Sequence, residues 1–202
     1  MPDRIVEDIC RPYLDRVSTD GELEHPLRRQ LHDELQRAVG QDQWRSYTRL
    51  SAACAVKAWP VWRSRFTEDL PFASPCPEAT LENPALSLTE HRGELNVLNT
   101  FLDNKMRLGH EYFPAVAAGL ACWAVNRDVL AGGFLADPEL SEMDMDSEDW
   151  EPSFFASVAI AGGAAWEESG NPEVRRKFWY WYLEDAVPRA YSIFRRHVPG
   201  GT

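Results

Sequence analysis

An acidic stretch at residues 137–151 is the strongest chemical signal in the sequence. It contains eight carboxylates and neither lysine nor arginine: Asp137, Glu139, Glu142, Asp144, Asp146, Glu148, Asp149 and Glu151. These side chains supply −8 of the net charge of −11, so the rest of the chain carries only −3. Because like charges repel in a compact chain, the stretch needs solvent, a bound cation or a basic partner around it.

A solvated loop without a role is the simplest interpretation of this stretch, and a calcium site is a second one. Asp144, Asp146 and Glu148 alternate as positions 1, 3 and 5 of a calcium-binding loop do. However, position 6 is Asp149 instead of glycine and position 12 is Phe155 instead of glutamate. The sharp turn and the bidentate ligand that close such a loop are therefore both missing, and we expect no metal site.

Docking to a basic protein is the third interpretation. Met143, Met145 and Trp150 lie among the carboxylates, and aromatic and methionine side chains inside a charged rim are typical of interface anchors. The candidate partner-binding residues are Glu142, Asp144, Asp146, Glu148, Asp149 and Trp150.

Motifs for catalysis are absent. The sequence has no glycine-rich nucleotide loop, no nucleophile elbow and no HExxH zinc motif, since His110-Glu111 is followed by Tyr112 and Phe113. Five histidines occur singly, and we expect surface or capping positions for them: His25, His32, His91, His110 and His197. We predict no catalytic residue, no cofactor and no enzymatic activity.

The amino-acid composition restricts the cellular compartment and the classes of binding partner that we expect. A pI near 4.9 gives a field that repels phosphate backbones and anionic lipids, so we expect neither nucleic acid nor membrane as a partner. No stretch approaches the roughly 20 apolar residues of a membrane-spanning helix, and the start of the chain is acidic where a signal peptide would be basic, so we expect a cytoplasmic protein. The cysteines are far apart and predicted to be reduced and mostly buried: Cys10, Cys54, Cys76 and Cys122.

Helical periodicity dominates the elements that must position these residues. It predicts helices over 24–39, 42–56, 89–107, 114–125, 152–160 and 172–196. Pro60 should end or kink the second of these near Ala58, with a short helix over 61–66 after it. Four prolines make 70–84 an extended surface connection. We therefore predict an all-α fold, a single compact domain of about six to nine helices over residues 1–202, with 137–151 as an acidic loop within it.

Aromatic residues mark two parts of the predicted core. Trp59 and Trp62 flank Pro60, and we expect both to be largely buried beside the aromatic run of the last helix, because exposed tryptophans would leave a large apolar area in water. That run, residues 178–182 (FWYWY), covers every face of a helix. It predicts either a central helix buried all round or an exposed recognition face.

Two segments of the sequence resemble a known protein family. Residues 49–62 (RLSAACAVKAWPVW), followed by Asp69-Leu70-Pro71, resemble the core of immunity family five of the bacterial polymorphic toxin systems. Residues 178–183 (FWYWYL) and 186–188 (AVP) are similar to the closing motif of that family. The resemblance implies a helical cytoplasmic protein without catalytic activity that binds and neutralises a cognate toxin in the producing cell. An acidic, motif-poor chain would suit a basic toxin.

Two other function classes remain open at this point. A helical enzyme or small-ligand-binding protein would have a concave site with a buried carboxylate or histidine of strongly shifted pKa. A homo-oligomeric structural protein would expose an apolar patch that pairs with itself about a two-fold axis.

Overall fold

The fold is all-α, as predicted. The computed structural model describes residues 2–39, 43–68, 70, 92–131 and 137–192, and none of these residues forms a strand. The α-helices are α1 (Pro2–Leu14), α2 (His25–Val39), α3 (Gln43–Arg63), α5 (Arg92–Met106), α6 (Phe113–Ala131), α7 (Pro152–Ala161), α8 (Pro172–Trp181) and α9 (Val187–Ser192). Short 3₁₀ turns occupy His110–Tyr112 and Ser147–Asp149, and a π-helical turn, Tyr182–Ala186, joins α8 to α9.

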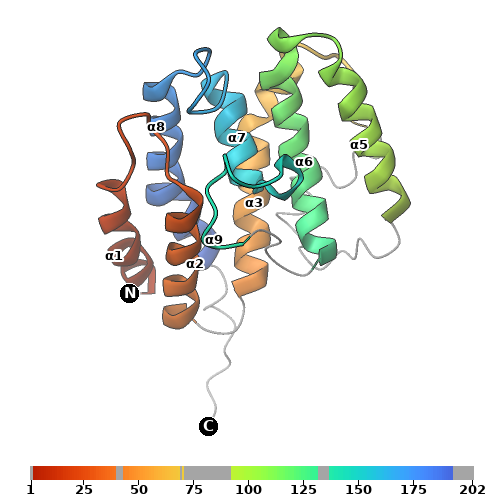
Figure 1. Cartoon of the computed structure of the whole chain (residues 1–202). Helices are drawn as coiled ribbons and strands as arrows, with labels where there is room; N and C mark the ends of the chain where they lie inside the picture. Colours follow the sequence, from red (N-terminus) through yellow and green to blue (C-terminus); the bar gives the residue numbers. More distant parts are fainter. Residues whose placement is uncertain (1, 40–42, 69, 71–91, 132–136, 193–202) are drawn as a thin grey trace.

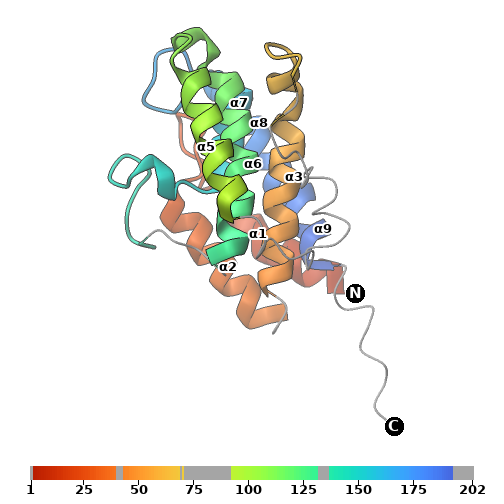
Figure 2. The same cartoon turned by 90° about the vertical axis from the view of Figure 1, so that its right-hand side faces the viewer.

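The helices α3, α6 and α7 pack against one another and form the centre of the domain (Figure 1). Helix α5 covers α6 on one side, while α1, α2, α8 and α9 lie on the other side (Figures 1 and 2). Helix α7 is apolar around its whole circumference, and all its residues except Ile160 are buried. A helix of this kind belongs in a core, so the residues just before α7 are fixed to a rigid element.

Helix boundaries follow the predicted proline and glycine signals. Pro152 stands in the first turn of α7, and Gly162 ends that helix in the left-handed conformation with φ of 85°, which a residue without Cβ adopts at no steric cost. Pro172 opens α8, and the Asn171 side chain accepts hydrogen bonds from the amides of Glu173 and Val174.

Helix α3 differs from one of the two outcomes predicted at Pro60, an end near Ala58, whereas a kink there stays a prediction. It does not end near Ala58 but continues through Pro60 to Arg63, so residues 61–63 belong to α3 and not to a separate helix. The Pro60 side chain is exposed, and the hydrogen bond it cannot donate is the cost of keeping Trp62 on the buried face. The connection predicted over 70–84 lies outside the described residues, except for Leu70, which is buried.

Trp62 is completely buried, as predicted, and its indole nitrogen donates to the Glu68 carbonyl over 3.0 Å. Its ring contacts are with Phe66 at 4.5 Å, Phe101 at 6.1 Å and Trp59 at 6.0 Å between centroids. Trp59 is only half-buried. The expected position beside the aromatic run of the last helix is wrong, because these partner rings lie on α5, on α3 and just after α3.

The aromatic run divides between the core and the surface. Phe178, Trp179 and Tyr182 are buried, whereas Trp181 is half-buried and Tyr180 is exposed. Burial on all sides is therefore wrong at Tyr180. Tyr182, the first residue of the π-helical turn, and Tyr191 of α9 both contact the same buried side chain, His32 of α2.

Three of the four cysteines, Cys10, Cys54 and Cys122, are free and buried, as predicted. Burial, aided by the Glu7 carboxylate, raises the pKa of the Cys10 thiol to about 12. Cys76 lies outside the described residues. Within the part of the chain that the structure describes, no helix is both long and apolar enough to cross a membrane.

Candidate partner-binding surface

The acidic stretch crosses the front of the domain between α2 and α6 and enters α7 at Pro152 (Figure 1). It contains one short 3₁₀ turn at Ser147–Asp149 and is otherwise irregular. Cationic side chains from two other elements, Arg28 of α2 and Arg127 of α6, hold it against the core.

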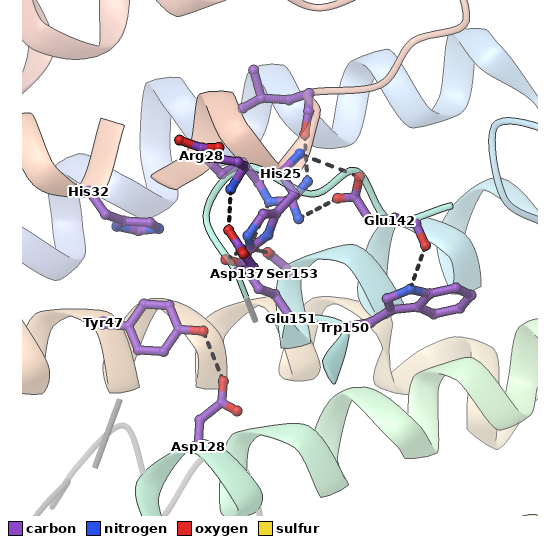
Figure 3. A network of polar contacts seen from close by, with 12 residues as sticks. His25, Arg28, His32, Tyr47, Asp128, Asp137, Glu142, Trp150, Glu151 and Ser153 are labelled. Carbon is purple, nitrogen blue, oxygen red and sulfur yellow. Dashed lines mark hydrogen bonds and ion pairs between the residues drawn. The ribbon is translucent and has the colours of Figure 1, made fainter. Parts of the chain in front are cut away.

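Arg28 is the centre of the first attachment (Figure 3). It is fully buried, and its Nη2 lies 2.5 Å from Glu142 Oε1 while its Nε donates to Glu151 Oε2 over 2.7 Å. Nη1 donates to the Leu23 carbonyl over 2.5 Å, and the guanidinium carbon lies 5.0 Å from the centroid of the Trp179 ring. One arginine thus ties both Glu142 and Glu151 to α2.

Glu22 and Arg175 extend this cluster. Glu22 Oε1 lies 4.0 Å from Arg28 Nη1, and its Oε2 lies 3.6 Å from Arg175 Nε. Three buried carboxylates therefore share two guanidinium groups, which leaves one excess negative charge. Burial and the neighbouring Glu142 raise the pKa of Glu22 to about 8, so a proton on Glu22 neutralises the cluster.

His25 and Glu151 lie on the α2 side of the same cluster. His25 Nδ1 is 3.5 Å from Glu151 Oε1, and the His25 amide donates to Glu142 Oε2 over 3.4 Å. Burial lowers the pKa of His25. Burial alone would raise the pKa of Glu151, but Arg28, His25 and His32 together outweigh burial and hold that pKa at about 2.

We expect Glu22→Gln to change how stability depends on pH. The ordinary glutamate pKa is 4.5, whereas folded Glu22 has a pKa of about 8. Between these values the unfolded chain releases the proton that the folded chain keeps, so the wild type loses stability as pH rises from 4.5 to 8. Glutamine keeps the neutral state at every pH. Urea unfolding at pH 5 and pH 8 measures the free energy of unfolding of both proteins. Relative to the wild type, the variant should be more stable at pH 8 than at pH 5. An equal difference in the free energy of unfolding at both pH values would refute the shifted pKa.

Arg127 on α6 makes the second attachment. It donates to the backbone carbonyls of Trp150, over 3.0 Å, and of Glu148. Its Nε and Nη2 donate to Asp128 Oδ1 over 2.8 and 2.6 Å. The Tyr47 hydroxyl donates to Asp128 Oδ2 over 2.9 Å (Figure 3). Asp128 therefore fixes the guanidinium that holds the backbone of the stretch. Burial raises the pKa of Asp128 to about 6 despite the opposing effect of Arg127.

Trp150 holds the acidic stretch through a hydrogen bond and through aromatic contacts. Its indole nitrogen donates to the Glu142 carbonyl over 2.9 Å (Figure 3). Its half-buried ring lies 5.0 Å from Phe154, 5.5 Å from Phe155 and 5.9 Å from Trp166 between centroids. Trp150 thus anchors the loop to the start of α7.

The structure separates the six candidate binding residues into two groups. Glu142 is buried in the Arg28 cluster, and Trp150 is half-buried, so both have a structural role. Asp144, Asp146 and Glu148 are exposed, and Asp149 is half-buried. The binding role of the six stays a prediction.

Other side chains of the acidic stretch are exposed as well. Met143 is 69% exposed and Leu140 is 38% exposed, and Asp137 and Glu139 are exposed as well. We call the exposed part of 137–148 the acidic ridge, consisting of Asp137, Glu139, Leu140, Met143, Asp144, Asp146 and Glu148. It combines carboxylates with two apolar side chains on a backbone held from beneath.

Two histidines depart from the predicted surface or capping positions. His25 and His32 are buried, and each ring nitrogen of His32 lies 3.0 Å from a tyrosine hydroxyl, Tyr191 or Tyr182. Burial lowers the pKa of His32 to about 4. His110 is exposed, as predicted, and the remaining two histidines lie outside the described residues. Among the residues that the structure describes, no three His, Cys, Asp or Glu side chains are grouped as metal ligands would be.

The sequence analysis missed Arg28 and Arg127, the residues that shape this surface. Each lies on a helix whose pattern resembles an ordinary amphipathic or apolar segment, and Arg28 is 123 residues from its partner Glu151. The only available signal was that the acidic stretch contains no lysine or arginine. This implied that its compensating cations come from other parts of the chain.

A comparison with protein families gives a match over most of the chain. The family model described as "Immunity protein Imm5" matches residues 13–189, which is most of the chain. A search of the curated proteins found no match.

Proposed function

The chain belongs to the Imm5 family of immunity proteins, and from this premise we propose that it binds a cognate bacterial toxin domain and neutralises it by masking the active or substrate-binding site. In this proposal the complex forms in the cytoplasm of the cell that makes both proteins, as part of a polymorphic toxin system. Immunity proteins are generally not enzymes, and inhibition by masking needs no catalysis by this chain.

The acidic ridge is the observation that supports this contact surface. Its backbone is attached through Arg28 and Arg127 at two places, so it is ordered before a partner arrives. A surface that is already ordered loses little conformational entropy on binding. Exposed Met143 and Leu140 add apolar area between the carboxylates, as in an interface with an apolar centre and a polar rim.

The charge of the ridge favours a basic partner. Toxins that act on phosphate-rich targets present lysine and arginine around their sites, because those side chains bind phosphate. Opposite potentials accelerate association by roughly ten- to a thousand-fold at low salt. We therefore propose that the acidic ridge covers the basic substrate-binding face of the toxin.

Charge reversal on the ridge tests this proposal. In a variant with Asp144→Lys, Asp146→Lys and Glu148→Lys, we expect association with the cognate toxin domain, sought in the reading frames next to this chain's gene, to slow by about ten-fold or more. The dependence of the association rate on salt should weaken in parallel. The three side chains are exposed, so the free energy of unfolding should change by less than about 1 kcal/mol. Stopped-flow kinetics at low and high salt measures both effects.

A second variant controls for net charge. Glu7→Lys, Asp15→Lys and Glu184→Lys change the charge by the same amount at exposed positions on and near α1 and α9. If the ridge is the contact surface, this variant slows association far less than the ridge variant. Equal slowing by both variants would show that only the overall charge matters and would remove the ridge as the contact surface.

A further inference from the structure

An open pocket of about 470 Å³ lies beside the acidic ridge. Its apolar wall joins α5, α6, α7 and the end of the acidic stretch, and consists of Met106, Phe113, Leu120, Trp150 and Phe155. One acidic side chain, Glu167, also lines it. From these features we infer that the pocket receives an arginine side chain of the toxin. This inference rests on the proposed function and names the residue that the partner inserts.

The shape and chemistry of the lining favour a long side chain with an apolar stem and a cationic end. Phe113, Leu120 and Phe155 offer apolar contacts to a stem. The half-buried Trp150 ring presents an aromatic surface on which a guanidinium can stack. Arginine is among the residues that most often dominate the free energy of protein–protein interfaces.

Glu167 supplies the charge for this occupant. Its Oε2 accepts a hydrogen bond from the Ala164 amide over 2.7 Å, which orients the carboxylate, and its Oε1 lies 3.7 Å from His110 Nε2. Carboxylate and guanidinium form paired, charge-assisted hydrogen bonds, which a planar fork donates and a point-like ammonium does not. Arginine thus fits this pocket better than lysine.

Three of the segments that line the pocket carry further acidic residues. Each of three lining segments carries an exposed carboxylate next to a lining residue: Glu111 follows His110, Asp146 and Glu148 flank Ser147, and Glu168 follows Glu167. Arg107 adds one exposed cation on the turn after α5. The local balance is negative, and it is continuous with the acidic ridge through residues 146–148, so one basic surface could cover both.

Two pocket variants test the inference. Glu167→Gln keeps an oxygen that accepts a hydrogen bond from the Ala164 amide but removes the charge, and Met106→Trp enlarges an exposed lining side chain without changing a core residue. We expect each to speed dissociation of the toxin complex by about ten-fold or more, with a smaller effect on association. Surface plasmon resonance measures both rates. Urea unfolding confirms that the variants are folded.

The matched control is Glu168→Gln, which removes the same charge from the adjacent exposed residue. It should leave the dissociation rate within about two-fold of the wild type. If Glu167→Gln and Glu168→Gln have equal effects while the wild type binds the toxin, the pocket inference is overturned and the proposed function stands. If the wild type forms no complex, the proposed function fails, and the inference fails with it.

The occupant itself is identified on the toxin side. Each surface arginine of the toxin domain is replaced by lysine in turn, and each variant is combined with Glu167→Gln in a double-mutant cycle. One arginine whose effect disappears in the Glu167→Gln background supports the inference. If no arginine of the toxin couples to Glu167, the inference is overturned, and a small molecule that occupies the pocket in the complex overturns it as well.

Discussion

Replacing Arg28 with methionine is expected to lower the free energy of unfolding by about 3–5 kcal/mol, the range measured when one partner of a buried ion pair is removed. Methionine fills most of the volume but leaves Glu22, Glu142 and Glu151 buried without their main cation. Protonation relieves part of this penalty, so the loss should be smaller at pH 5 than at pH 8. Urea unfolding at the two pH values measures both quantities.

Two comparisons show whether the loss comes from the charge cluster. Arg37→Met changes an exposed arginine of the same helix and should alter stability by less than about 0.5 kcal/mol. In a background with all three carboxylates changed to glutamine, Arg28→Met should cost much less, because no buried charge is left unpaired. An undiminished cost in that background would mean that Arg28 acts through packing alone.

The second large effect is expected for Trp62→Ala, which should cost about 3–5 kcal/mol, as truncations of buried large aromatic residues do. The ring is fully buried and packs against Phe66 and Phe101, and Gly119 leaves room for it on α6. Tyr180→Ala removes an exposed aromatic and serves as the control. A loss below about 1 kcal/mol for Trp62→Ala would contradict the tight packing of this region.

Local sequence signals predicted most of the described helices, because each signal depends on neighbouring residues, but they missed α1 (Pro2–Leu14). The start of α7 at Pro152, its end at Gly162 and the start of α8 at Pro172 follow from one residue each. Pro60 does not end its helix, although an internal proline usually does, because the helix-breaking effect of proline competes with tertiary packing. The missing hydrogen bond costs less than exposing Trp62, so α3 continues past Ala58.

The acidic stretch shows the limit of composition as a guide. Eight carboxylates without a local cation predicted a solvated or partner-bound loop. In the fold, Glu142 and Glu151 turn inward because Arg28 arrives from a helix more than 110 residues earlier in the chain. Such a pairing leaves no periodic pattern in the sequence. The exposed carboxylates Asp144, Asp146 and Glu148 remain as the part that composition predicted correctly.

Growth protection is the direct test of the claim that this chain neutralises a toxin by binding it. The cognate toxin domain is induced in a bacterial host, alone or with the chain co-expressed, and growth is followed with the amount of both proteins verified. We predict that the toxin alone arrests growth and that the wild-type chain restores it, while the Asp144→Lys, Asp146→Lys, Glu148→Lys variant restores it less. Equal arrest with and without the folded wild-type chain would contradict the claim.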